Sequence, residues 1–85
     1  MSRYRIQYSG HADKVHAEMP AAFRLRFDAE IARTLGEDPY GHGSGPAGSP
    51  KEEDRRLASV AGALVRYYIA GPPLLVVTAV KIVHF

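Results

Sequence analysis

The sequence predicts an α+β domain with the element order β-α-α-β-β-β, in which two N-terminal helices pack on one face of a small antiparallel-type sheet. Two observations predict this fold: a strong helical pattern over residues 21–35, and three strand-like runs between residues 54 and 85. Strands at both ends of a sequence, with helices between them, are typical of this class. From a length of 85 residues we expect one domain, spanning residues 1–85.

The first strand is expected at Arg3–Tyr8, where polar and apolar residues alternate strictly. This period of two directs Tyr4, Ile6 and Tyr8 to one side and predicts a half-buried strand. A short helix is expected next, at His11–Met19, with apolar residues on one of its faces.

The second helix, Ala21–Leu35, is the clearest element of the sequence. Apolar residues recur every four positions along it, which predicts a stripe that packs on the sheet. The stripe consists of Phe23, Phe27, Ile31 and Leu35, with Leu25 and Ala32 beside it. On the exposed side, ion pairs at i,i+4 spacing are expected for Arg24–Asp28 and Arg26–Glu30.

Three antiparallel strands are expected after a loop at Glu37–Lys51, which is too rich in Gly and Pro to form a regular element. The expected strands are Leu57–Val60, Leu64–Ala70 and Leu74–Val83, separated by the Gly- and Pro-containing turns that hairpins need. Alternation along the second of them leaves Arg66 and Tyr68 on an open face. The apolar residues that alternate with them, and that should face the helices, are Val65, Tyr67 and Ile69.

The charge of the C-terminal segment is one-sided, because no acid follows Asp54. Its basic residues are Arg55, Arg56, Arg66 and Lys81, followed by His84. A sheet whose charges are all positive is a candidate surface for an anion, and phosphate backbones are the common one. Charges that protect solvated strand positions are the alternative explanation. With a net charge of only +2, any binding would depend on where these charges lie.

Metal, cofactor and membrane sites are not expected. The chain has no cysteine, which excludes disulfides and thiolate metal sites and favours a reducing cytoplasm. His11 and His16 are five residues apart, a spacing that does not place two metal ligands on one helical face. The apolar run Leu74–Val80 is too short to span a bilayer, and residues 1–10 lack the apolar region of a signal peptide.

Several stretches of the sequence follow one another in the order found in a known family. They are Tyr4-Arg5-Ile6 in the first strand, Met19-Pro20 before the long helix, residues 31–40 at the end of that helix, and Asp54-Arg55-Arg56, Gly62 and Leu64-Val65-Arg66-Tyr67 in the following strands. In these stretches and in its element order, nearly the whole chain resembles the RelE/ParE superfamily of toxins from type II toxin–antitoxin systems.

The resemblance to toxins of the RelE and YoeB kind implies an mRNA interferase. Such an endoribonuclease enters the ribosomal A site and activates a 2′-hydroxyl group to attack the adjacent phosphate. This chemistry needs a base, an acid and cations that stabilise the charged phosphorane. The resemblance implies no metal or cofactor, and its implied partners are mRNA, on the ribosome in that family, and a cognate antitoxin protein.

By the same resemblance, His84 and Arg66 are the candidate catalytic residues. Leu64 stands where the family has its phosphate-stabilising Arg, and Arg66, two residues later, faces the same side of the strand. Phe85 replaces the Tyr of the YoeB-type ending. The candidate RNA-binding residues are Arg55, Arg56, Tyr68 and Lys81.

Two alternatives to an RNase remain open. The ParE-like branch of the superfamily lacks the ribonuclease residues and inhibits a protein target, DNA gyrase. A toxin relative that has lost its activity is the other alternative. An RNase should lose activity with His84→Ala, whereas a toxin that binds a protein should be indifferent to this change.

Overall fold

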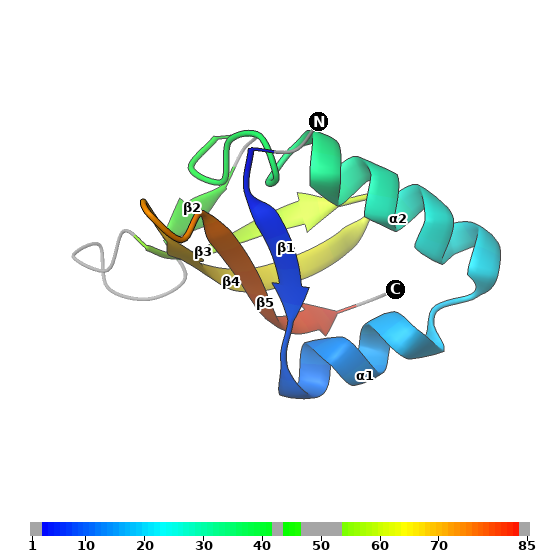
Figure 1. The fold of residues 1–85 in the computed structure, drawn as a ribbon. Coiled ribbons are helices and arrows are strands. Elements are labelled where there is room, and N and C mark those ends of the chain that lie inside the picture. Colours follow the sequence, from blue (N-terminus) through cyan, green and yellow to red (C-terminus); the bar gives the residue numbers. More distant parts are fainter. Residues whose placement is uncertain (1–2, 42–43, 47–53, 84–85) are drawn as a thin grey trace.

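The computed structural model describes residues 3–41, 44–46 and 54–83, and there it confirms the predicted α+β class with two helices (Figure 1). The sheet has five strands, one more than predicted. The helices are α1 (Gly10–Glu18) and α2 (Ala21–Arg33). The strands are β1 (Arg5–Tyr8), β2 (Gly45–Pro46), β3 (Arg55–Val60), β4 (Ala63–Ala70) and β5 (Val76–Val83). Apart from β2, their order along the chain is the one predicted from the sequence.

The sheet is mixed, so the prediction of an antiparallel-type sheet is wrong for its first strand. The strand order is β1-β5-β4-β3-β2, and β3, β4 and β5 are antiparallel neighbours, as predicted. β1, however, runs parallel to β5, with Ile6 opposite Val77. The period of two identifies the buried side of a strand but not the direction of its neighbour. Because β1 and β5 are not joined by a hairpin turn, no local signal fixes their relative direction.

The short strand β2 lies within the Gly-rich segment for which the sequence predicts no regular element, so that prediction is also wrong. Gly45 pairs with Leu57, and Pro46 pairs with Arg56. Pro lacks a backbone N–H, but the sheet tolerates it here because β2 is an edge strand.

The last strand, β5, begins two residues later than the expected start at Leu74. The N–H groups of Leu74 and Leu75 instead donate hydrogen bonds to the carbonyl oxygen of Gly71, at 3.0 and 3.2 Å. Leu75 also has a φ of +51°, which is incompatible with a strand. The β4–β5 turn therefore extends through Leu75 and leaves the Leu74 side chain 69% exposed.

The stripe predicted for α2 is the part of the helix that packs on the sheet. Phe27 and Ile31 are buried, and Leu35, just after the helix, is buried with them. Leu25, expected beside the stripe, is instead 76% exposed. It lies two positions from both Phe23 and Phe27, which is the opposite side of a helix with 3.6 residues per turn.

The charged residues of α2 form different bonds from those predicted at i,i+4. Oδ1 of Asp28 lies 2.6 Å from Nε2 of His16 on α1. Glu30 accepts a hydrogen bond from Arg33, one turn later, at 2.5 Å. These contacts connect α1 to α2 and hold the end of α2.

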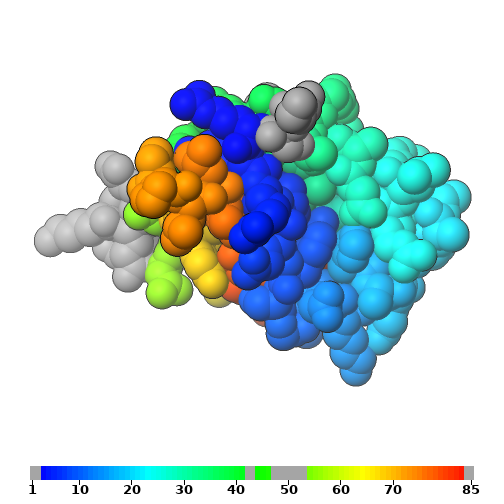
Figure 2. Space-filling view, in the orientation of Figure 1, coloured from blue at the N-terminus to red at the C-terminus, as the bar shows by residue number. Residues whose placement is uncertain are grey.

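Both helices pack on the same face of the sheet, because their buried residues join those of β3, β4 and β5 in one core cluster. Tyr4, Ile6 and Tyr8, which flank or belong to β1, pack against this cluster from the edge of the sheet, as their alternation predicts. In Figure 2 the start of β1 (blue) lies beside the β4–β5 turn (orange), and the N–H of Arg5 donates to the carbonyl oxygen of Leu75 at 2.9 Å. Neither described helix has the length and apolar character needed to cross a membrane.

Candidate functional site

The face of the sheet opposite the helices, here called the open face, carries alternate residues of four strands. On β4 the exposed residues Leu64, Arg66 and Tyr68 alternate with buried ones, as the sequence predicts. The register extends this face to the neighbouring strands. Its other members are Arg55, Leu57 and Ser59 on β3, Val76, Thr78, Lys81 and Val83 on β5, and Arg5 and Gln7 on β1.

Arg66 and Lys81 are register partners at the centre of the open face. Both side chains are exposed, and together they line a hollow of about 150 Å³. The remaining lining residues are aliphatic: Leu57, Leu64 and Val83. The hollow therefore combines two cations with an apolar surface, a combination suited to an anion that carries an organic group.

A β-bulge places Lys81 in this hollow. Arg66 pairs with Lys81, whereas the next residue, Tyr67, pairs with Ala79, so Val80 is an extra residue in β5. Without the bulge, Lys81 would face the same side as Ala79, which is buried in the core. One inserted residue thus turns the Lys81 side chain to the open face.

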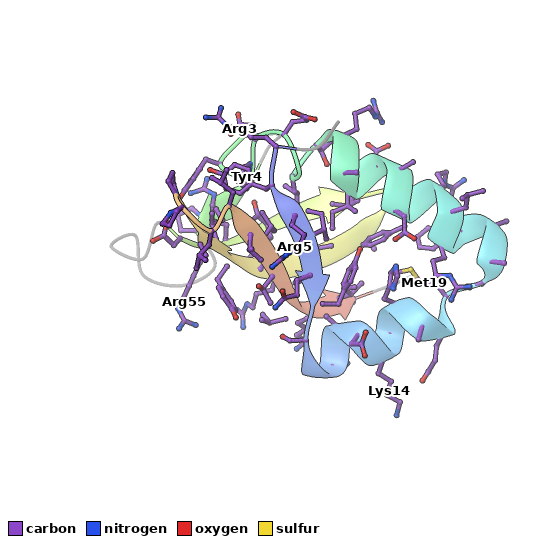
Figure 3. All side chains as sticks on the ribbon, viewed as in Figure 1. Arg3, Tyr4, Arg5, Lys14, Met19 and Arg55 are labelled. Atoms are coloured by element: carbon purple, nitrogen blue, oxygen red, sulfur yellow. The ribbon has the colours of Figure 1, made fainter. Side chains whose placement is uncertain are left out.

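Arg55 and Tyr68 form a second register pair, next to the hollow. Tyr68 is 41% exposed, and the side chain of Arg55 points away from both helices (Figure 3). Both candidate residues therefore lie on the open face with Arg66 and Lys81. A basic side chain beside an exposed aromatic ring can bind a phosphate and stack on a base.

Arg56, by contrast, lies on the other face of β3 and contacts the loop that follows α2. Its Nε donates to Oγ of Ser44 at 2.9 Å, and its Nη2 donates to the carbonyl oxygens of Tyr40 and Ser44, both at 3.2 Å. Its guanidinium group also lies 5.5 Å from the centre of the Tyr40 ring. The structure therefore separates Arg56 from the other candidate residues and gives it a role in holding this loop.

The carboxylate of Asp54 belongs to the same loop attachment. The hydroxyl of Tyr40 donates to its Oδ1 at 2.6 Å, and this bond is the main reason that the pKa of Tyr40 is raised to about 12. The Asp54 carboxylate therefore binds Tyr40, the same residue that Arg56 contacts. The described residues of the open face include no Asp or Glu.

The remaining candidate, His84, lies outside the described residues. Val83, the residue directly before it in the sequence, lines the hollow. Within the described ranges, no group of three or more His, Cys, Asp or Glu side chains is arranged to hold a metal ion.

Two polar residues of the open face, Arg5 and Gln7, are absent from the sites predicted from the sequence. Their alternation with Ile6 and Tyr8 does indicate an outward direction. What the sequence lacks is the pairing of β1 with β5, which brings them onto the same face as Arg66 and Lys81. Basic residues on the polar side of the first strand are the signal that could have included them.

No protein-family model matches this sequence, and no curated protein matches it either. Function is therefore inferred from the fold and from the residues of the open face.

Proposed function

We propose that this chain is the toxin of a type II toxin–antitoxin system, of the RelE/ParE kind, and acts in the cytoplasm as an mRNA interferase. The observation that carries the proposal is the cross-strand pair of Arg66 and Lys81 over a partly apolar hollow. The β-α-α-β-β-β order of the main elements supports it as well. In this proposal, mRNA binds to the open face and a cognate antitoxin neutralises the protein.

The proposed chemistry is attack of a 2′-hydroxyl group on the neighbouring phosphate. The phosphorane formed in this step carries extra negative charge, and two fixed cations stabilise such a state more than the ground state. Arg66 and Lys81 have this role. Leu64 and Arg66 both line the hollow, which supports assigning to Arg66 the role that the resemblance gives to an arginine at position 64.

Proton transfer is assigned to His84, because an imidazole can act as both base and acid near neutral pH. Arg55 holds a neighbouring phosphate, and Tyr68 offers a ring on which an unpaired base stacks. Arg56 is left out of this proposal because its guanidinium group binds Ser44 and Tyr40.

The test is induced expression in bacteria with mRNA cleavage mapped in the same cells. Wild type is compared with Arg66→Ala, Lys81→Ala and His84→Ala, and with Lys14→Ala as a control of equal charge change on α1, on the helix side of the molecule (Figure 3). We expect growth arrest with cuts in phase with codons for wild type and control. We expect both effects to be lost in the other three variants.

Two results would contradict the RNase proposal. Growth arrest without RNA cuts, unchanged in His84→Ala, would indicate a protein target such as DNA gyrase. Neither arrest nor cuts would indicate a relative without toxin activity. Co-purification with the product of an adjacent gene would test the antitoxin separately, because that partner is expected for either kind of toxin.

A further inference from the structure

Strand β1 extends the open face by one strand beyond the proposed site. Arg5 and Gln7 are exposed, whereas Ile6 and Tyr8 pack against the core on the other side. In the register, Arg5 lies beside Val76 and Gln7 lies beside Thr78. Both polar side chains therefore stand on the same face as Arg66 and Lys81.

The open face is organised in rows that cross the strands. The first row holds Arg66 and Lys81, and the second runs from Gln7 through Thr78 and Tyr68 to Arg55. Arg5 occupies the third row, beside Val76. Successive rows are about 7 Å apart, because two residues of a strand span that distance.

Arg5 is therefore separate from the hollow but within reach of the same ligand. One strand spacing and two rows place its backbone on the order of 15 Å from that of Lys81. Because side chains stand roughly perpendicular to a sheet, the two charged groups are separated by a similar distance and contact different phosphates. An extended chain of a few nucleotides can reach both, since its phosphates follow one another at a spacing similar to that of the rows.

The residues between the two cationic positions favour a nucleobase. Tyr68 is exposed in the second row, and Thr78, which separates it from Gln7, is only 3% exposed, so Tyr68 and Gln7 form the accessible surface there. An aromatic ring can stack on a base of any type, and the amide of Gln7 offers both a donor and an acceptor to a base edge. Such contacts need an unpaired base, which a duplex does not present.

We propose that a single strand of RNA lies along β5, with one phosphate in the Arg66–Lys81 hollow and a later phosphate at Arg5, and with the intervening base stacked on Tyr68 and its edge at Gln7. This inference rests on the proposed function and names the substrate as single-stranded RNA longer than a dinucleotide. Arg5 and Gln7 contact parts of this RNA away from the cleaved bond.

The test measures the affinity of two RNAs whose 2′-hydroxyl groups are methylated, so that they cannot be cleaved. One is a dinucleotide with a single bridging phosphate, and the other is an octanucleotide of mixed sequence. NMR titration follows the first and fluorescence anisotropy the second. The proteins are wild type, Arg5→Ala, Arg66→Ala and Arg26→Ala, an equal charge change on the exposed side of α2.

For Arg5→Ala we expect the octanucleotide to bind about threefold to fivefold more weakly, as for loss of one exposed ion pair. The slope of its log affinity against log salt concentration should become less negative by about 0.7, the value for one phosphate contact of a single strand. Dinucleotide binding should be unchanged. Arg66→Ala should lower the affinity for both RNAs, and Arg26→Ala should lower the affinity for neither.

If Arg5→Ala lowers the affinity for both RNAs equally, or for neither, the inference is overturned, although the hollow can still be a phosphate site. The inference is also overturned if Arg26→Ala lowers the octanucleotide affinity as much as Arg5→Ala does, because the effect would then depend only on net charge. If wild type binds neither RNA, the proposed function itself is contradicted. Thermal unfolding of each variant verifies that the fold is retained.

Discussion

Arg66 on β4 and Lys81 on β5 stand directly opposite each other, so two positive charges share one cross-strand position. Like charges in this arrangement destabilise a sheet. A protein selected only for stability would have an opposite charge or an uncharged residue at one of the two positions. In the proposed function, a phosphate group bound between the two side chains offsets this repulsion.

The first prediction separates stability from binding at this pair. Lys81→Gln should raise the free energy of unfolding by about 0.2–1 kcal/mol, because it removes the cross-strand repulsion, and should weaken RNA binding. Urea unfolding and RNA titration measure the two effects. Lys14→Gln, an exposed change on α1, should alter neither. A Lys81→Gln protein that is less stable than wild type would contradict the prediction.

The second prediction concerns the neighbouring residues Arg55 and Arg56, which the sequence does not distinguish. Arg56→Ala should lower the free energy of unfolding by about 1 kcal/mol, because it removes the hydrogen bonds to Ser44 and Tyr40. Its RNA affinity should remain that of wild type. Arg55→Ala should weaken RNA binding. Loss of RNA binding in correctly folded Arg56→Ala would contradict this assignment.

The alternation of residues along β4 correctly predicts which side chains are buried, because the strand is regular and is buried on one face only. Val65, Tyr67 and Ile69 are all buried, and the residues between them are exposed. In β5 strict alternation from Ala79 would turn Lys81 toward the core. The bulge at Val80 instead shifts the residues after it by one position, so that Lys81 lies on the open face. No residue type in this apolar strand marks the bulge, so the sequence does not reveal it.

The predictions for the direction of β1 and for the position of Leu25 are wrong for different reasons. The pairing of β1 with β5 depends on contacts between distant parts of the chain, which periodicity does not encode. Leu25 could have been placed correctly, because a helical residue two positions from Phe23 and Phe27 faces away from them. For the site, the same long-range pairing explains why Arg5 and Gln7 are missing from the prediction.

The third prediction compares the adjacent tyrosines of β4. The Tyr67 hydroxyl donates to the carbonyl oxygen of buried Pro39 at 2.5 Å, and the Tyr67 side chain is 1% exposed. Tyr67→Phe should therefore lower the free energy of unfolding by about 1 kcal/mol, since a buried carbonyl loses a partner. Tyr68→Phe, on the open face, is the matched control and should leave the unfolding midpoint in urea unchanged. Equal midpoints for the two variants would contradict the prediction.

Three tyrosines have a raised pKa, each for a physical reason visible in the structure. Burial is the main cause at Tyr8, and the nearby Asp28 carboxylate adds to it. Burial is also the main cause at Tyr67. At Tyr40 the leading cause is the hydrogen bond to Asp54, which raises the pKa to about 12. The folded protein therefore favours the neutral phenol at all three positions.

The fourth prediction is a loss of stability at alkaline pH. In the unfolded chain these phenols ionise near pH 10, so above that pH the unfolded state binds fewer protons than the folded state. The stabilisation is complete below about pH 10 and is lost as the pH rises toward the folded pKa, about 12 for Tyr40. Urea midpoints should therefore fall between about pH 9 and 11, and less steeply for Tyr40→Phe. Between about pH 7 and 9 the two proteins should show the same slope, and equal slopes above pH 10 would show that Tyr40 is not linked to folding.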